Sequence, residues 1–215
     1  MTTGEQQRRR SSSDNPASLS PAHRKLMNEH YGLSDQTIDR WGCFSVSQDD
    51  LTCNNFAPGV QAPGIALPIL PPGAREAQNF LYRPDNPRKF TRDGKVRVAK
   101  YENAMGATNH IHVPRSVQAR LFGPDGNQVR VLVVTEGPIK AEAAAQRGID
   151  CVALLGVWNW RQKFGDESVP IEDLSKLPWP EFEAVEICFD SDAATNPQVL
   201  KAERALAQWF QEHGA

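Results

Sequence analysis

The chain has 215 residues, of which 40% are hydrophobic and 23% are charged, and its formal net charge is −2. These values are typical of a globular protein that can bury one good core or two modest ones, and they exclude binding of nucleic acid through overall charge. No apolar run approaches a membrane span and the N-terminus lacks a secretory h-region, so we expect a cytoplasmic protein with no membrane partner.

The first half of the chain divides by composition. Residues 1–20 are polar and poor in aromatic residues, which predicts a disordered tail. Residues 21–42 are expected to form a helical hairpin, because Gly32 follows one short helical pattern and Ser34 caps the next. From residue 43 to 129, short extended runs such as "GIALPIL" and "HIHVP" alternate with clusters of Pro, Gly and Asp. This pattern predicts a small, β-rich α+β subdomain.

Residues 130–215 have a different pattern. The runs "VLVVTEG", "CVALLG" and "AVEICFD" have the character of buried strands, and "PIKAEAAAQRGI" and the C-terminal "NPQVLKAERALAQWFQEHGA" have that of helices. This alternation predicts an α/β domain with a parallel sheet flanked by helices. Because a further strand would follow the last helix, we expect the domain to lack its last strand, or the chain to be part of a longer protein.

Four cysteines, at positions 43, 53, 151 and 188, lack the CxxC spacing of a zinc ribbon. Cys151 and Cys188 lie in two of the apolar strand-like runs. We therefore expect reduced cysteines, with these two thiols buried.

Three carboxylates come at the ends of predicted strands. Glu136 ends the first strand of the α/β region, and Asp190 and Asp192 follow the third, one residue apart. Because ligands bind at the carboxyl ends of parallel strands, we expect these side chains to converge at one edge of the sheet. Converging carboxylates need a cation, and oxygen ligands suit Mg²⁺ or Mn²⁺. The alternative is a set of acidic residues that cap helices and solvate loops.

The stretches "VLVVTEGPIKAEAAAQRGI", "CVALLG" and "VEICFDSDAA" resemble the Toprim domain family, whose signature is a strand-end Glu-Gly followed later by a strand-end Asp-x-Asp. Upstream, "GIALPIL", "NFLYRPDNPR" and "KYENAMGATNHIHVP" are similar to the pattern that precedes the Toprim domain in DnaG-type primases. The nearest resemblance is to the primase-like Toprim domain of uncharacterised plasmid, phage and mobile-element replication proteins, in which "TEGxxKA" replaces "VEGYxD". The resemblance begins at about Gly64 and continues to the C-terminus.

The resemblance implies that Glu136, Asp190 and Asp192 are catalytic acids that bind Mg²⁺ or Mn²⁺. Lys140 follows Glu136 by one helical turn, where it would pair with Glu136 in a resting state or contact a phosphate. An ordinary lysine on a helix surface is the alternative.

Contacts with nucleic acid are expected in two regions. The stretch 83–100 is rich in arginine and lysine, and "VWNWR" at 157–161 places aromatic rings beside an arginine, which suits stacked bases. A solvated hairpin and a tryptophan packed under its loop are the alternatives. The residues expected to contact nucleic acid or nucleotides are Arg83, Arg88, Lys89, Lys100, Tyr101, Lys140, Trp158 and Arg161.

Three functions follow from these expectations. The first is a primase-like module of a DNA replication protein that carries out metal-dependent nucleotidyl transfer on a nucleic-acid template. The others are a Toprim nuclease and a non-catalytic module that binds nucleic acid or a replication partner. The expected partners are single-stranded DNA, nucleotides, and a replicative helicase or a C-terminal helicase domain. The sequence itself contains no zinc ribbon and no GxxxxGK[ST] motif.

Overall fold

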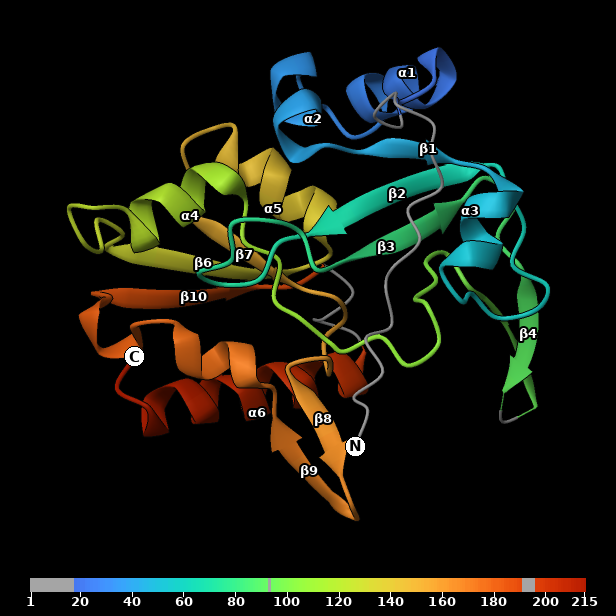
Figure 1. The fold of residues 1–215 in the computed structure, drawn as a ribbon. Helices are drawn as coiled ribbons and strands as arrows, with labels where there is room; N and C mark the ends of the chain where they lie inside the picture. Colours follow the sequence, from blue (N-terminus) through green and yellow to red (C-terminus); the bar gives the residue numbers. More distant parts are fainter. Residues whose placement is uncertain (1–17, 93, 191–195) are drawn as a thin grey trace, which may run out of the picture.

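A computed structural model describes residues 18–92, 94–190 and 196–215 (Figure 1). Residues 1–17 of the predicted tail lie outside this part. The helices are α1 (Pro21–Glu29), α2 (Asp35–Trp41), α3 (Gln48–Cys53), α4 (Arg115–Phe122), α5 (Pro138–Ala145) and α6 (Pro197–Glu212), with 3-10 helices η1 (Glu172–Lys176) and η2 (Trp179–Glu181). The strands are β1 (Phe44–Val46), β2 (Gly64–Ile69), β3 (Asn79–Pro84), β4 (Lys89–Arg92), β5 (Lys95–Val98), β6 (Val131–Glu136), β7 (Cys151–Leu154), β8 (Arg161–Phe164), β9 (Glu167–Pro170) and β10 (Ala184–Cys188).

The C-terminal half is built on a parallel sheet in the order β10-β6-β7. Its three strands are the three apolar runs of the sequence, and the chain passes from β6 to β7 through α5. Helices lie on both faces of the sheet (Figure 1). The predicted α/β fold class, with a parallel sheet flanked by helices, is therefore confirmed.

The two faces of β6 bury different partners. Leu132 and Val134 point into the main core, where they join Leu206 and Phe210 of α6. All four side chains are at most 4% exposed. The apolar stripe of α6 thus covers one face of the sheet, as its helical periodicity predicts.

Helix α5 covers part of the other face and joins the two halves of the molecule. Ala141 packs against Cys151 and Ala153 of β7, whereas Ile139 packs into the cluster formed by α1, α2 and the N-terminal sheet. At the C-terminal end of α5, Gln146 accepts a hydrogen bond from the backbone N–H of Ser34 at 2.9 Å. The orientation of α5 is therefore set by contacts on two sides.

The N-terminal half contains an antiparallel sheet in the order β1-β2-β3. Ile65, Leu67 and Ile69 of its central strand are fully buried. At the start of this strand, a Cβ on Gly64 would lie 2.5 Å from the carbonyl oxygen of Arg83, so only glycine fits this close approach of β3.

The two sheets are connected through the segment that contains "HIHVP". We predicted a strand here, but the segment forms only an isolated bridge, between His112 and Ala153 of β7. On its other side, the backbone N–H of Leu70 donates to His112 Nδ1, and the N–H of Val113 donates to the carbonyl of Leu70. Pairing with two different sheets explains why no regular strand forms.

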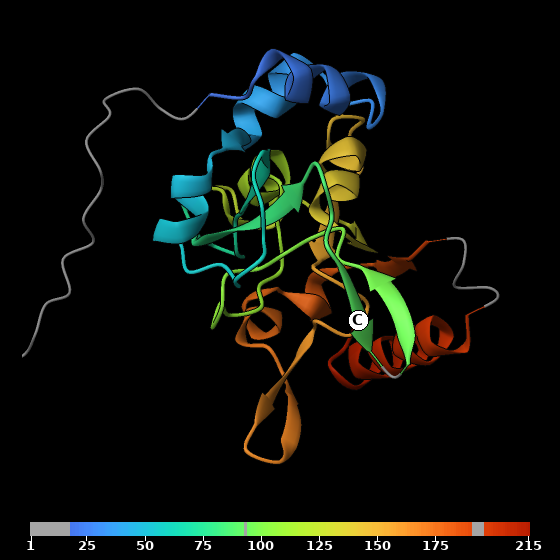
Figure 2. The same ribbon diagram turned by 90° about the vertical axis from the view of Figure 1, so that its right-hand side faces the viewer.

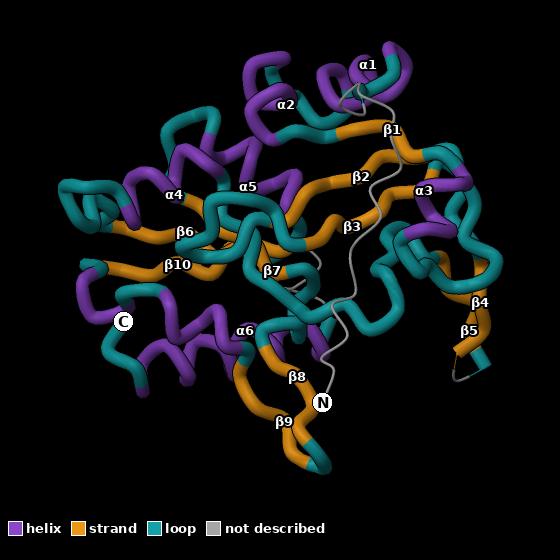
Figure 3. The backbone as a smooth tube through the Cα atoms, in the orientation of Figure 1, coloured by secondary structure: helices purple, strands orange, loops and turns teal. Residues whose placement is uncertain are grey.

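Two hairpins project from the body of the molecule (Figures 1 and 3). The hairpin of β4 and β5 forms in the basic stretch 83–100, where a hairpin was the alternative interpretation of the sequence, whereas the hairpin of β8 and β9 was not predicted. The turned view also shows β8 and β9 standing away from the rest of the chain (Figure 2). In the second hairpin Gly165, with φ of 61°, forms the tight turn that reverses the chain.

Candidate functional site

Two of the three predicted acids lie at the carboxyl edge of the parallel sheet. Glu136 is the last residue of β6, and Asp190 follows the end of β10 by two residues. The register pairs Thr135 with Cys188, and the Thr135 hydroxyl donates to the Cys188 carbonyl at 2.8 Å. Gly137, with φ of 84°, then turns the chain from β6 into α5. Neighbouring parallel strands that end level thus bring the two acids together.

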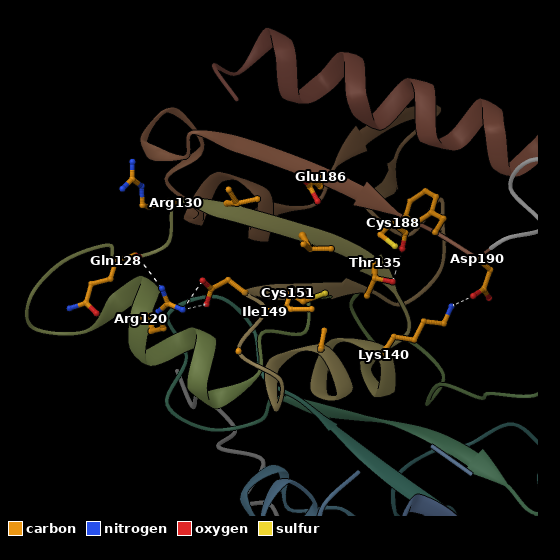
Figure 4. A pocket seen from close by; sticks show the side chains of 16 residues that line it. Arg120, Gln128, Arg130, Thr135, Lys140, Ile149, Cys151, Glu186, Cys188 and Asp190 are labelled. Atoms are coloured by element: carbon orange, nitrogen blue, oxygen red, sulfur yellow. Dashed lines mark hydrogen bonds and ion pairs between the residues drawn. The ribbon is translucent and has the colours of Figure 1, made fainter. Parts of the chain in front are cut away.

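Lys140 links the two carboxylates. Its Nζ hydrogen bonds to Asp190 Oδ1 (Figure 4). The same Nζ lies 3.6 Å from Glu136 Oε1. The hydrogen bond from Lys140 holds the pKa of Asp190 below its ordinary value against the opposing effect of burial, and a hydrogen bond with the Glu136 side chain and the charges of Lys140 and Lys100 lower it further. Asp190 is therefore ionised at neutral pH.

Asp192 lies outside the described residues, so its role as a third acid stays a prediction. Within residues 18–92, 94–190 and 196–215, no group of three or more His, Cys, Asp or Glu side chains could hold a metal ion. The described part of the site is thus a pair of carboxylates with a lysine between them.

Lys100, Tyr101 and Arg83 are far from the acids in sequence but gather beside them in the fold. Burial raises the pKa of Tyr101 to about 12, with the nearby Tyr31 and Asp190 raising it and Arg83 opposing. Arg83 Nε donates to the Tyr31 hydroxyl at 2.8 Å, and its guanidinium lies 5.7 Å from the centre of the Tyr31 ring. Tyr31 is a member of this group that sequence reasoning missed, since it follows α1 with no motif around it.

Arg88 and Lys89 have different environments at the start of the β4–β5 hairpin. Arg88 Nη2 lies 3.1 Å from Glu102 Oε2, and Glu102 is only 8% exposed. Arg88 therefore stabilises a buried carboxylate, while Lys89 is exposed to solvent.

The "VWNWR" stretch forms a turn and the start of the β8–β9 hairpin. Trp158 is half-buried, whereas Trp160 is 3% exposed and belongs to the main core. The guanidinium of Arg161 lies 5.2 Å from the centre of the Trp160 ring, and its Nη2 donates to the carbonyl of Ser168 across the hairpin. Of the two tryptophans, only Trp158 has an exposed surface available for stacking.

Three histidines are tied to carboxylates. His110 Nδ1 lies 2.9 Å from Asp173 Oδ2, and His112 Nε2 lies 3.1 Å from Glu142 Oε1. In α1, His23 contacts Asp85 at 3.1 Å and the Ser45 hydroxyl at 2.6 Å. His23, Asp85 and Ser45 are the residue types of a hydrolase triad. Ser45 Oγ, however, also accepts a hydrogen bond from the backbone N–H of Ser20. The hydrogen bonds of this group therefore connect α1 to β1 and to the turn after β3.

A groove of about 820 Å³ runs along the half of the sheet that α5 leaves uncovered. Lys140 and Asp190 line one end of it, and Arg120, paired with Asp150, lines the other (Figure 4). Cys188 lies in this groove and is exposed, so the prediction that its thiol is buried is wrong. The reason is that β10 is the edge strand of the described sheet and none of the described helices covers it on this face.

Among the described residues, no helix has the length and apolar character needed to span a membrane.

Comparisons with known proteins give the following matches. The model of a domain of unknown function, DUF3854, matches residues 126–215. No curated protein matches the chain. A structure of the DnaG catalytic core has 18% sequence identity and a TM-score of 0.54, over 90% of this chain and 60% of that one. A structure of the DnaG primase catalytic domain bound to single-stranded DNA has 18% identity and a TM-score of 0.49, over 81% of this chain and 56% of that one.

This chain therefore spans less than two thirds of the length of the two DnaG structures. At this level of identity the likeness to the DnaG catalytic core concerns the fold, and it accounts for both halves of the molecule because it extends over 90% of the chain. The chain is folded like the DnaG catalytic core.

Proposed function

We propose that this chain is a primase-like module of a DNA replication protein, which carries out metal-dependent nucleotidyl transfer on a single-stranded DNA template. The observation that carries the proposal is the meeting of Glu136 and Asp190 around one ammonium group, at the sheet edge where ligands bind in α/β folds. The DnaG-like fold supports the same function.

The donor set of this site fits Mg²⁺ or Mn²⁺. These ions take oxygen ligands, and Mg²⁺ is usually held by one or two carboxylates together with water and substrate phosphates. Glu136 and Asp190 already attract a cation, the ammonium of Lys140, and Asp192 is the proposed third ligand. When bound, the metal would neutralise charge on phosphate oxygens and lower the pKa of the attacking hydroxyl.

The chain's own residues supply the remaining binding groups. Tyr101, with a pKa of about 12, keeps its proton at neutral pH, so it acts as a hydrogen-bond donor to a phosphate oxygen and not as a base. Lys100, close enough to lower the pKa of Asp190, places a positive charge beside the acids. Arg83, oriented by Tyr31, adds a second. Tyr101, Lys100 and Arg83 thus offer three hydrogen-bond donors beside the two acids. This arrangement suits a triphosphate that contacts both the metal and these donors.

Incubation of the chain with single-stranded DNA, nucleoside triphosphates and Mg²⁺ or Mn²⁺ tests the proposal. Template-dependent synthesis of short oligonucleotides is the expected result, measured by gel electrophoresis of labelled products. Degradation of the template instead would identify a nuclease that uses the same acids. Absence of both products would contradict a catalytic role for the isolated chain.

A non-catalytic nucleic-acid-binding module is the second candidate, and the β4–β5 hairpin favours it. Phe90, Val96 and Val98 of this hairpin are 36%, 70% and 49% exposed, and basic side chains lie among them. Exposed apolar and basic groups together suit a single strand, whose bases stack while its phosphates are neutralised.

Replacement of Lys89, Lys95 and Arg97 by glutamine should weaken binding of single-stranded DNA. The slope of log K against log salt should fall by about 2, since each neutralised phosphate of a single strand contributes about 0.7. Fluorescence anisotropy over a salt series measures both quantities. The control is Lys201→Gln with Arg204→Gln, which removes two positive charges on the exposed side of α6 and should leave the slope unchanged. An equal loss in both variants would mean that the hairpin has no special role.

A further inference from the structure

Lys140 lies in the first turn of α5, three residues after Gly137, which turns the chain from β6 into this helix. Its neighbours Ile139 and Ala141 are buried against two different parts of the core, so the helix cannot rotate to move the lysine away. The side chain itself is 43% exposed, and its four-carbon stem is flexible. The backbone therefore holds Lys140 beside the acids, while its ammonium is free to leave.

The same carboxylates have two possible cationic partners. Lys140 is hydrogen bonded to Asp190 and lies 3.6 Å from Glu136, and these are the oxygens that would coordinate the metal. Two adjacent carboxylates repel each other unless a positive charge lies between them. Lys140 supplies that charge in the structure, so a divalent ion must compete with it for the same oxygens.

We propose that Lys140 is a built-in counter-cation, which occupies the acid pair in the absence of metal and is displaced when a divalent ion binds. This inference rests on the proposed function, because it takes Glu136 and Asp190 as the metal ligands. The displaced ammonium stays tethered at the edge of the site. It becomes available there to a phosphate of the incoming nucleotide, which is the alternative partner that its charge favours.

Exchange of one cation for another couples metal binding to nucleotide binding. Without a triphosphate, the metal must separate Lys140 from its carboxylates, which lowers the affinity for the metal. With a triphosphate, the ammonium gains a new anionic partner, so metal and nucleotide strengthen each other's binding. Removal of the lysine should therefore tighten metal binding and weaken its dependence on nucleotide.

Binding of Mn²⁺ to the full chain tests this, followed by electron paramagnetic resonance of the free ion, which requires no catalytic activity. Lys140→Gln should bind Mn²⁺ about three- to tenfold more tightly than the wild type, the range expected for loss of one or two exposed ion pairs. Lys140→Arg keeps the charge and should bind no more tightly than the wild type. A non-hydrolysable triphosphate should tighten Mn²⁺ binding more in the wild type than in Lys140→Gln.

Two further variants separate displacement from a general effect of charge. Lys100→Gln removes one positive charge near Asp190 but leaves Lys140 in place. Its affinity for Mn²⁺ should therefore rise less than that of Lys140→Gln. Lys25→Gln removes the lysine of another i,i+4 pair, with Glu29 on α1, and should have no effect. Circular dichroism checks that each variant is folded.

The outcomes distinguish the inference from the function on which it rests. The inference would be overturned if the wild type binds Mn²⁺ and the affinity for Mn²⁺ rises equally in Lys140→Gln and Lys100→Gln, or rises in neither. The proposed metal site would still stand in that case. No binding of Mn²⁺ to any variant would overturn the metal site itself.

Discussion

Asp190→Asn and Glu136→Gln are expected to abolish oligonucleotide synthesis while the fold persists. Each change removes a negative charge and one of the oxygens that hold the metal, and the metal contributes several kcal/mol to the stabilisation of the transition state. The rate should therefore fall on the order of a hundredfold or more. Gel quantification of products at saturating Mg²⁺ measures the loss, and circular dichroism shows whether the fold is kept.

Asp125→Asn is the matched control, because Asp125 is exposed in the turn before β6, away from the carboxyl edge of the sheet. It should leave synthesis unchanged. Activity that persists in both Asp190→Asn and Glu136→Gln would rule out these acids as metal ligands. The same comparison with Asp192→Asn tests the third predicted acid.

His112→Ala is expected to lower the free energy of unfolding by about 3–5 kcal/mol. His112 is 1% exposed and Glu142 is 5% exposed, so the substitution leaves a carboxyl group buried without its histidine partner. It also removes the acceptor for the Leu70 backbone N–H and the ring that contacts Trp41, 5.4 Å away between centres. Urea denaturation followed by tryptophan fluorescence measures the change.

His30→Ala is the control for this prediction, since His30 is exposed at the end of α1, and it should change the free energy of unfolding by less than about 0.5 kcal/mol. The double variant His112→Leu with Glu142→Leu should recover much of the lost stability, because an apolar pair leaves no buried group without a partner. If His112→Ala lowers the free energy of unfolding as little as His30→Ala does, the pair of His112 and Glu142 contributes little to the packing between the two halves.

Local sequence determined the parallel sheet. Continuous apolar runs such as "VLVVTEG" have few alternatives to a buried strand, and Gly137 and Pro138 determine where β6 ends and α5 begins. Because the carboxyl ends of neighbouring parallel strands meet, the strand pattern predicted that Glu136 and Asp190 approach each other, provided that β10 lies beside β6. The hairpin of β8 and β9 was missed because its strands are short and exposed, and they lack the apolar alternation of a half-buried strand.

The tertiary structure decided which groups surround the histidines of "NHIHVP" and Cys188. Pairing of the two histidines of "NHIHVP" with Asp173 and Glu142 depends on chain segments 30 or more residues away, which no local pattern specifies. The exposure of Cys188 follows from the position of β10 at the sheet edge, since strand order is not encoded within one strand.

The sequence by itself determined that this chain has an α/β domain with acids at the ends of its strands, because strand periodicity and turn chemistry are local properties. Only the tertiary structure decided that Lys140 lies between Glu136 and Asp190, and that Tyr101 and Arg83 come from the other half of the molecule to join them. These contacts form when α5 packs between the two sheets, and that packing depends on the whole core.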